Sequence, residues 1–346
     1  MSGTRHVRAP FPITLAVAVI VLAASIVGGT LVGTANLSPL DVVSTIMRHI
    51  GLGAVAPTPA LPELLDALVW ESRVPRVLLA AVVGIGLTVS GAVLQSVTRN
   101  PLADPYLLGV SSGASTGAVA VLLLGIGGGA LSLSTGAFLG ALLSFGILML
   151  LLGGGRVQSA SRVVLTGVLV SQFFAAITSV VLMVNGDANS TRGFVFWLLG
   201  SLGGARWEPL IVAGTVILIG VIAVQFFAPA LDAFTFGWDS AAALGINVRA
   251  ARVALMILTA VVTAAAVAAS GAIGFIGLLI PHVIRLLFGP THRSLLPLAG
   301  LTGGAFLIWV DAFARSAFSP NELPVGVITA LLGAPAFAIV LRRAGS

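Results

Sequence analysis

Runs of about twenty apolar residues, separated by short polar stretches, make up most of the chain. A helix of about 20 residues crosses the hydrocarbon of a bilayer, so the pattern predicts membrane-spanning helices. Nine runs are long enough: 13–35, 77–97, 106–126, 133–152, 163–184, 208–228, 252–273, 295–314 and 323–341. We expect a tenth crossing at 275–288, which is shorter and interrupted by Pro281, because the chain must return before the next polar stretch. The apolar piece 194–202 predicts a half-inserted or external helix.

The composition agrees with a protein that lives in lipid. The chain is 58% hydrophobic and 8% charged, whereas a soluble domain has roughly a quarter of its residues charged. The absence of cysteine excludes disulfides, thiolate metal sites and cysteine nucleophiles. The first apolar run is too long for a cleaved signal peptide, so we expect a retained helix. We therefore predict an all-α, polytopic membrane protein with one transmembrane domain over residues 1–346.

The arginines predict the orientation of the helices. All 17 basic residues are arginines and are spread singly, which is not the pattern of a nucleic-acid-binding patch. With the N-terminus inside and ten crossings, both ends are cytoplasmic. Eleven arginines then fall inside, in agreement with the positive-inside rule: Arg5, Arg8, Arg99, Arg156, Arg162, Arg249, Arg252, Arg285, Arg293, Arg342 and Arg343. Six fall outside: Arg48, Arg73, Arg76, Arg192, Arg206 and Arg315.

Two similar stretches suggest an internal repeat. SGAVLQSVTRNP (90–101) and SGAIGFIGLLIP (270–281) each place a proline eleven residues after the serine. They run in opposite directions across the membrane in this topology, as five-helix halves of an inverted repeat would. The alternative is two unrelated small-residue packing sites between helices.

The stretch TRNPLADP (98–105) interrupts the apolar pattern with polar residues and two prolines. Pro101 and Pro105 end the preceding helix, and Asn100 and Asp104 can hold backbone groups that the break leaves free. Irregular backbone at membrane depth persists only where protein buries it or where it lines a cavity. The stretch therefore suits a gate or a pathway wall, with an ordinary tight turn as the alternative.

Several blocks in the same order resemble one known family, the FecCD/BtuC permeases of type II ABC importers. The similar blocks are SRVPRVLLAAVVGIGLTVSGAVLQSVTRNPLADPYLLGVSSGAS (72–115), FWLLGSLGGARW (196–207), SGAIGFIGLLIPHVIRLLFGPTHR (270–293) and VDAFARSAFSPNELPVGVITALLGAPAF (310–337). The resemblance implies the type II permease fold in a bacterial cytoplasmic (inner) membrane. It implies two permease copies around a pathway, two cytoplasmic ATPases and an external solute-binding protein. The implied cargo is an iron–siderophore complex, with haem or vitamin B12 (cobalamin) as alternatives, and no cofactor is implied.

The resemblance also implies docking residues on the outer face. Arginines of relatives receive acidic residues of the binding protein there, and the matching positions are Arg73, Arg76 and Arg315. A guanidinium keeps its charge and pairs bidentately with a carboxylate. The alternative is that these side chains extend to the lipid headgroups.

The longest inner connection, 228–252, matches the family segment that seats in the ATPase. The positions carried over are Phe236, Gly237, Trp238, Asp239, Ala241, Leu244 and Gly245, with Phe236, Ala241 and Leu244 as the apolar contact face. Relatives usually have an acid directly after the glycine, where this chain has Trp238. A plain surface loop is the alternative, but 25 residues is long for a connection.

A cytoplasmic gate is implied in two connections. The matching residues are Asn100 and Leu102 after the second span, and Ala160 and Ser161 before the fifth. The small Ala160 replaces a hydroxyl of some relatives and would make the gate more apolar.

Two polar residues inside apolar runs have local explanations. His282 lacks a second ligand at metal spacing, so we expect it to hydrogen-bond carbonyls freed by Pro281 rather than to bind haem or a metal. Asp311 is expected to satisfy polar groups near the outer end of its helix.

Two other classes of protein compete with an ATP-driven permease. The chain has no P-loop and no lysine, so a partner must hydrolyse ATP. An ion-coupled secondary transporter generally needs acids at mid-membrane, whereas the acids here lie in loops and at helix ends. An intramembrane enzyme would need a His-Glu-x-x-His cluster, which is absent, or a base beside a serine, for which His282 is the intramembrane candidate. We therefore expect no catalytic site.

Overall fold

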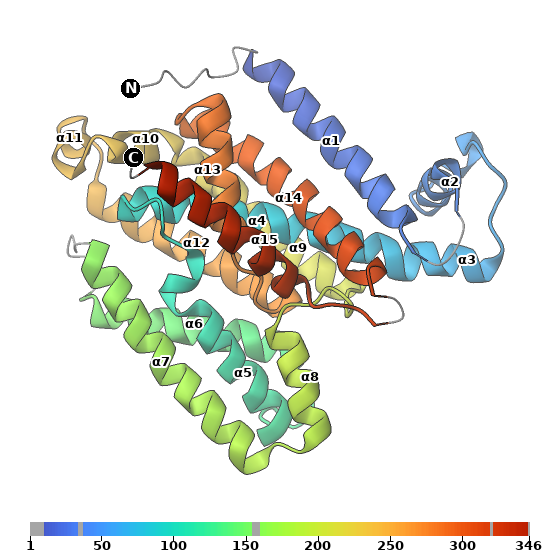
Figure 1. Ribbon diagram of the computed structural model, residues 1–346, viewed down its shortest axis with the longest axis horizontal. Coiled ribbons are helices and arrows are strands. Elements are labelled where there is room, and N and C mark those ends of the chain that lie inside the picture. The colour runs from blue at the N-terminus through green and yellow to red at the C-terminus, as the bar shows by residue number, and fades with distance from the viewer. Residues whose placement is uncertain (1–9, 34–36, 154–159, 319–320, 345–346) are drawn as a thin grey trace.

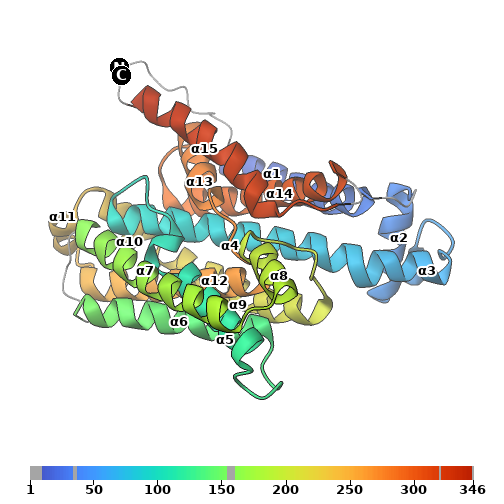
Figure 2. The same cartoon turned by 60° about the horizontal axis from the view of Figure 1, so that its bottom comes forward.

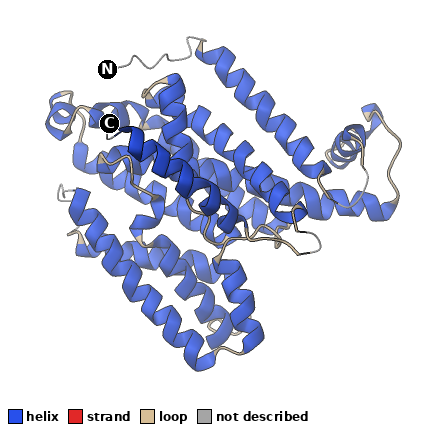
Figure 3. Ribbon diagram, in the orientation of Figure 1, coloured by secondary structure: helices blue, strands red, loops and turns tan. Residues whose placement is uncertain are grey.

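The computed structural model describes residues 10–33, 37–153, 160–318 and 321–344, and the regular structure in these ranges is helical (Figure 3). The helices are α1 (Phe11–Leu31), α2 (Pro39–His49), η1 (Gly53–Val55), α3 (Glu63–Ala67), η2 (Leu68–Arg73), α4 (Val74–Thr98), η3 (Pro105–Leu108), α5 (Val110–Leu124), α6 (Leu133–Leu151), α7 (Ala160–Asn185), α8 (Ala188–Leu198), α9 (Trp207–Phe226), α10 (Ala228–Thr235), α11 (Trp238–Ala243), α12 (Val248–Ser270), α13 (Ile276–Phe288), α14 (His292–Ser316) and α15 (Val325–Ala344).

Each of the ten predicted spans contains a helix. Seven helices in the described ranges are long and apolar enough to cross a membrane, and α5, α13 and α15 are shorter apolar helices. The piece at 194–202 overlaps α8, which ends at Leu198. The prediction of an all-α, multi-pass membrane protein is therefore confirmed. Three of the arginines counted for orientation, Arg5, Arg8 and Arg156, lie outside the described residues.

Helix α4 is the centre of the bundle. It packs against α14, α12, α13 and α9, whereas α1 lies at the periphery and buries little of its surface. Figure 2 shows α4 between a layer with α1, α13, α14 and α15 and a layer with α5, α6, α7, α9 and α12. The helices α3, η2 and α4 are continuous over Glu63–Thr98. The segment η2 is a π-helical turn just before Pro75. Because Pro75 has no N–H, it cannot donate to a carbonyl of this preceding turn.

The order of the helices repeats. Each half begins with a long helix (α1 or α9), continues with two short helices (α2 and α3, or α10 and α11) and ends with four apolar helices (α4–α7, or α12–α15). Figure 1 shows α2 and α3 at one end of the bundle and α10 and α11 at the other. We call these the α2–α3 end and the α10–α11 end. The opposite placement of the two pairs is what an inverted repeat requires.

Both halves also break at the same place in this order. In each half the helix after α4 or α12 is preceded by an irregular segment. This segment is 99–109 before α5 and 271–275 before α13. The two segments touch: the Tyr106 hydroxyl accepts from the Ile273 N–H at 2.7 Å and donates to the Ile273 carbonyl at 3.0 Å. As predicted, Asn100 Oδ1 accepts from Leu102 N at 2.9 Å, and Asp104 Oδ1 accepts from Tyr106 N at 2.9 Å.

Glycines let α4 approach its neighbours closely. A side chain at Gly91 would overlap the Gly277 carbonyl of α13, and one at Gly84 would overlap Gly303 of α14. The two Ser-Gly-Ala stretches are not equivalent, however. The first lies inside α4, whereas the second begins at Ser270, where α12 ends. The repeat is therefore present in the order of the helices, and the alignment of those two stretches was wrong.

Candidate functional site

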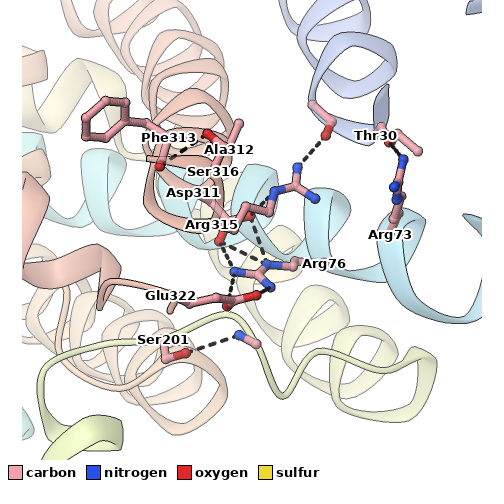
Figure 4. Close-up of polar contacts among 12 residues, drawn as sticks. Thr30, Arg73, Arg76, Ser201, Asp311, Ala312, Phe313, Arg315, Ser316 and Glu322 are labelled. Carbon is pink, nitrogen blue, oxygen red and sulfur yellow. Dashed lines mark hydrogen bonds and ion pairs between the residues drawn. The ribbon is translucent and has the colours of Figure 1, made fainter. Parts of the chain in front are cut away.

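A cluster of charged side chains joins three segments at the α2–α3 end (Figure 4). Arg76 of α4 donates from Nε to both Asp311 oxygens at 3.0 Å and from Nη2 to Asp311 Oδ1 at 2.9 Å. Its Nη1 and Nη2 also donate to the Glu322 carboxylate at 3.1 and 2.9 Å. The side chain of Asp311 is 1% exposed and that of Glu322 is 40% exposed. Asp311 thus satisfies polar groups at this end of α14, as the sequence predicted.

Two further arginines hold the end of α1. Arg73 Nη1 donates to the Thr30 carbonyl at 3.1 Å, and Arg315 Nη2 donates to the Gly29 carbonyl. The last carbonyls of a helix lack partners within the helix and carry partial negative charge, so the two cations suit them. Gly33 leaves room for Arg73, because a side chain there would overlap the guanidinium.

The predicted docking arginines therefore lie together but are engaged within the chain. Arg73, Arg76 and Arg315 contribute three positive charges, and Asp311 and Glu322 contribute two negative charges. The cluster keeps an excess positive charge, and Glu322 is its most exposed carboxylate. Docking of a binding protein at these arginines stays a prediction.

The connection predicted to seat in an ATPase forms two short helices at the α10–α11 end. Gly237, with φ of 109°, immediately precedes α11, and Gly245, with φ of 81°, lies just after its end; both angles favour glycine. Phe236 is 77% exposed and Leu244 is 71% exposed, so both are available to a partner. Ala241 is buried, so the prediction that it shares their contact face was wrong, because its methyl group packs into the chain's own core.

Trp238 has a partner within the chain. The guanidinium carbon of Arg252 lies 5.0 Å from the centre of the Trp238 ring, and Phe234 packs against that ring edge-on at 5.1 Å. Arg252 is buried, and its Nε and Nη1 have no hydrogen-bond partner among the described residues. The indole face thus gives the buried Arg252 guanidinium a cation–π contact. Asp239, the next residue, is exposed.

The two connections predicted to form the gate adjoin elements that pack together, η3 and α7. The segment with Asn100 and Leu102 continues into η3, and η3 packs against α7. A side chain at Gly167 of α7 would overlap the Leu107 carbonyl, so the two backbones touch. Leu102 is exposed. Ser161, in the first turn of α7, is exposed, and Ala160 begins that helix.

The carbonyl freed by Pro281 has a different partner from the one predicted. Gln95 of α4 donates to the Gly277 carbonyl at 3.1 Å, and Arg285 donates to Gln95 Oε1 at 3.2 Å. The side chain of His282 makes no hydrogen bond with the described residues, so the prediction for His282 was wrong. The described residues also contain no group of three potential metal ligands.

A buried bridge at the α10–α11 end was not predicted. His292, the first residue of α14, lies with Nδ1 2.7 Å from Asp232 Oδ1 of α10 and with Nε2 2.6 Å from Ser96 Oγ of α4. The base beside a serine is thus His292 rather than His282. His292 is 1% exposed and Ser96 is buried, so the pair is closed to a substrate. Nothing in the spacing of these three residues along the chain indicated that they meet.

The comparisons with known proteins agree on one family. The model of the FecCD transport family matches residues 17–343. The chain belongs to the FecCD transport family. It is similar to an uncharacterized ABC transporter permease protein, YvrB, of Bacillus subtilis, with 40% identity over 93% of this chain and 91% of YvrB. We therefore describe it as the permease of a type II ABC importer.

Other relatives serve different cargoes. The cobalamin import system permease BtuC of Halobacterium salinarum is 41% identical over 82% of this chain and 75% of its own. The hemin transport system permease HmuU of Yersinia pestis is 42% identical over 80% of this chain and 83% of its own. A solved inward-facing structure, described as a metal-chelate type ABC transporter, matches with a TM-score of 0.82 and 30% identity. The match covers 96% of this chain and 99% of the solved chain.

Proposed function

We propose that this permease and a second copy form the pathway of an ATP-driven importer in the bacterial cytoplasmic membrane. An external binding protein would deliver an iron–siderophore complex, and two cytoplasmic ATPases would drive transport. The observation that carries the proposal is the family match over residues 17–343. In this proposal the α10–α11 end and both chain ends are cytoplasmic, which places eleven of the 17 arginines inside.

The exposed apolar tip of the inner connection supports an ATPase partner. Phe236 and Leu244 are large apolar side chains on short helices, and both are mostly exposed. Apolar side chains presented together at a surface commonly mark a protein contact. Deletion of 237–245 removes this tip and should release the ATPase from the complex, as measured by co-purification. A complex that survives the deletion would show that the ATPase binds elsewhere.

The permease itself has no proposed catalytic role and no cofactor. Several of its charged side chains are engaged in helix-to-helix contacts, such as those of Arg76 with Asp311 and of Asp232 with His292. Hydrolysis of ATP is assigned to the partner, because the sequence has no P-loop.

Haem and cobalamin are the second proposal for the cargo. The relatives that transport hemin and cobalamin are 42% and 41% identical to this chain. The cargoes are separated by titrating the cognate binding protein with a ferric siderophore, haemin and cyanocobalamin, followed by uptake into vesicles that contain the whole complex. Nanomolar binding and uptake of the siderophore alone supports the first proposal, and the same result for haemin or cyanocobalamin alone overturns it.

A further inference from the structure

We propose that Asp232, His292 and Ser96 form a joint that makes α10 and the adjoining ends of α4 and α14 move as one body. The inference rests on the proposed function, in which an ATPase acts on α10 and α11. It goes further by assigning the transmission of that action to the buried His292 and Ser96 and to the half-buried Asp232, which lie outside the exposed contact surface.

Asp232 fixes α10 to the first turn of α14. One carboxylate oxygen accepts from the His292 backbone N–H at 2.8 Å and contacts the ring Nδ1 at 2.7 Å. Two contacts to one residue define both the position and the direction of the carboxylate. A nearby contact strengthens the connection, because Gln225 at the end of α9 donates to the Arg293 carbonyl at 3.1 Å. Helix α10 is therefore tied to α14 both directly and through the end of α9.

The other side of the imidazole fixes α4. Nε2 of His292 lies 2.6 Å from Ser96 Oγ, which is also 3.0 Å from the Ala92 carbonyl. When the ring is neutral with its proton on Nδ1, Nε2 accepts a hydrogen bond from the Ser96 hydroxyl. The hydroxyl then cannot donate to the Ala92 carbonyl. An imidazolium donates to both Asp232 and Ser96, and the Ser96 hydroxyl then donates to the Ala92 carbonyl. In both states the ring contacts Asp232 and Ser96, so α10 and α4 stay joined.

The joint lies next to the proposed gate. Ser96 is in the last turn of α4, one turn before Asn100, and the helix ends at Thr98. Asp232 is in α10, one turn before the exposed Phe236. The joint itself is packed, with His292 at 1% exposure, and a packed interior transmits displacement with little slack. A push on α10 is therefore passed to the segment 99–109.

Three variants each remove one side-chain contact of the joint and leave the exposed Phe236 and Leu244 unchanged. Ser96→Ala removes the contact to α4 and keeps the one to Asp232. His292→Asn places an amide near the former Nδ1 and loses Ser96, whereas His292→Gln places it near the former Nε2 and loses the side-chain contact to Asp232. Thr98→Val is the matched control, because this buried hydroxyl in the same turn bonds only the Leu94 carbonyl of its own helix, at 2.7 Å.

The experiment uses the whole complex of permease, ATPase and binding protein in lipid nanodiscs. Because the natural chain has no cysteine, Leu102→Cys allows one nitroxide label in each permease copy. The distance between the two labels is measured without nucleotide and after trapping with ATP and vanadate. The rate of ATP hydrolysis and the amount of assembled complex are measured in the same samples.

In the otherwise unsubstituted complex and in Thr98→Val we expect trapping to change the distance between the labels. In the three joint variants we expect assembled complexes that hydrolyse ATP, with a distance change about fivefold smaller or less. A full distance change in Ser96→Ala and His292→Asn would overturn the inference. Loss of assembly in the joint variants but not in Thr98→Val would also overturn it, since the bridge would then only maintain the shape of the ATPase contact. Failure of the unsubstituted chain to form an ATP-hydrolysing complex would instead contradict the proposed function.

Discussion

The ion-pair cluster at the α2–α3 end predicts very different effects for its two acids. Asp311 is buried between Arg76 and Arg315, whereas Glu322 is 40% exposed. Asp311→Asn keeps the shape of the side chain but leaves the buried guanidinium groups without their closest counter-charge. Breaking a buried pair in this way costs about 3–5 kcal/mol, while loss of an exposed pair costs about 0–1 kcal/mol. Asp311→Asn should therefore destabilise the permease several-fold more, in free energy, than Glu322→Gln.

The assay is thermal unfolding of the detergent-solubilised permease, followed by tryptophan fluorescence, since the chain contains five tryptophans. At about 2 °C per kcal/mol for a large domain, Asp311→Asn should lower the midpoint by about 6–10 °C and Glu322→Gln by less than about 2 °C. Arg76→Gln combined with Asp311→Asn should cost less than the sum of the two single changes, because the first loss removes the partner of the second. Equal shifts for the two acids, or additive effects in the double variant, would refute the assignment of Asp311 as the buried counter-charge.

Three further predictions concern other parts of the molecule. Glu322→Gln should strengthen docking of the binding protein, measured by surface binding, because it removes a carboxylate that competes for Arg76; weaker docking would argue against that arginine as the docking group. Trp238→Glu should raise the unfolding midpoint by pairing with the buried Arg252, and Trp238→Ala should lower it; the opposite order would show that the indole matters for packing alone. Burial raises the pKa of Asp104 to about 6, above its unfolded value of about 4, so the free energy of unfolding should fall by about 3 kcal/mol as the pH rises through that interval. Asp104→Asn should abolish this dependence in unfolding curves measured from pH 4 to 8, and an unchanged profile would assign it to another group.

The helices and their breaks could be predicted from local sequence. Nine apolar runs of membrane length and the shorter run at 275–288 predicted the ten apolar helices. Prolines with Asn100 and Asp104 marked the irregular segment after α4. The glycines at 237 and 245 likewise marked α11, because positive φ angles favour glycine. These features depend on residues a few positions apart, which is the range over which sequence patterns are informative.

The partners of buried polar groups could not be predicted in the same way. Gln95 donates a hydrogen bond to the Gly277 carbonyl, 182 residues away, and the Ser96 hydroxyl is hydrogen-bonded to His292, 196 residues away. Such pairs depend on how α4 packs against α13 and α14, and the composition of a single helix does not specify its neighbours. The burial of Ala241 was missed for a similar reason: a methyl group suits a partner surface and the chain's own core equally well. The polar contacts between helices thus required the three-dimensional structure.

In the proposed importer, the force for transport comes from a separate ATPase seated against α10 and α11. The most direct test is uptake of a ferric siderophore, haemin or cyanocobalamin into vesicles that contain the permease, its ATPase and its binding protein, with ion gradients collapsed. We expect uptake of one of these cargoes only when ATP and the ATPase are present. Uptake by the permease without the ATPase, or uptake that stops when an ion gradient is collapsed although ATP is supplied, would contradict it.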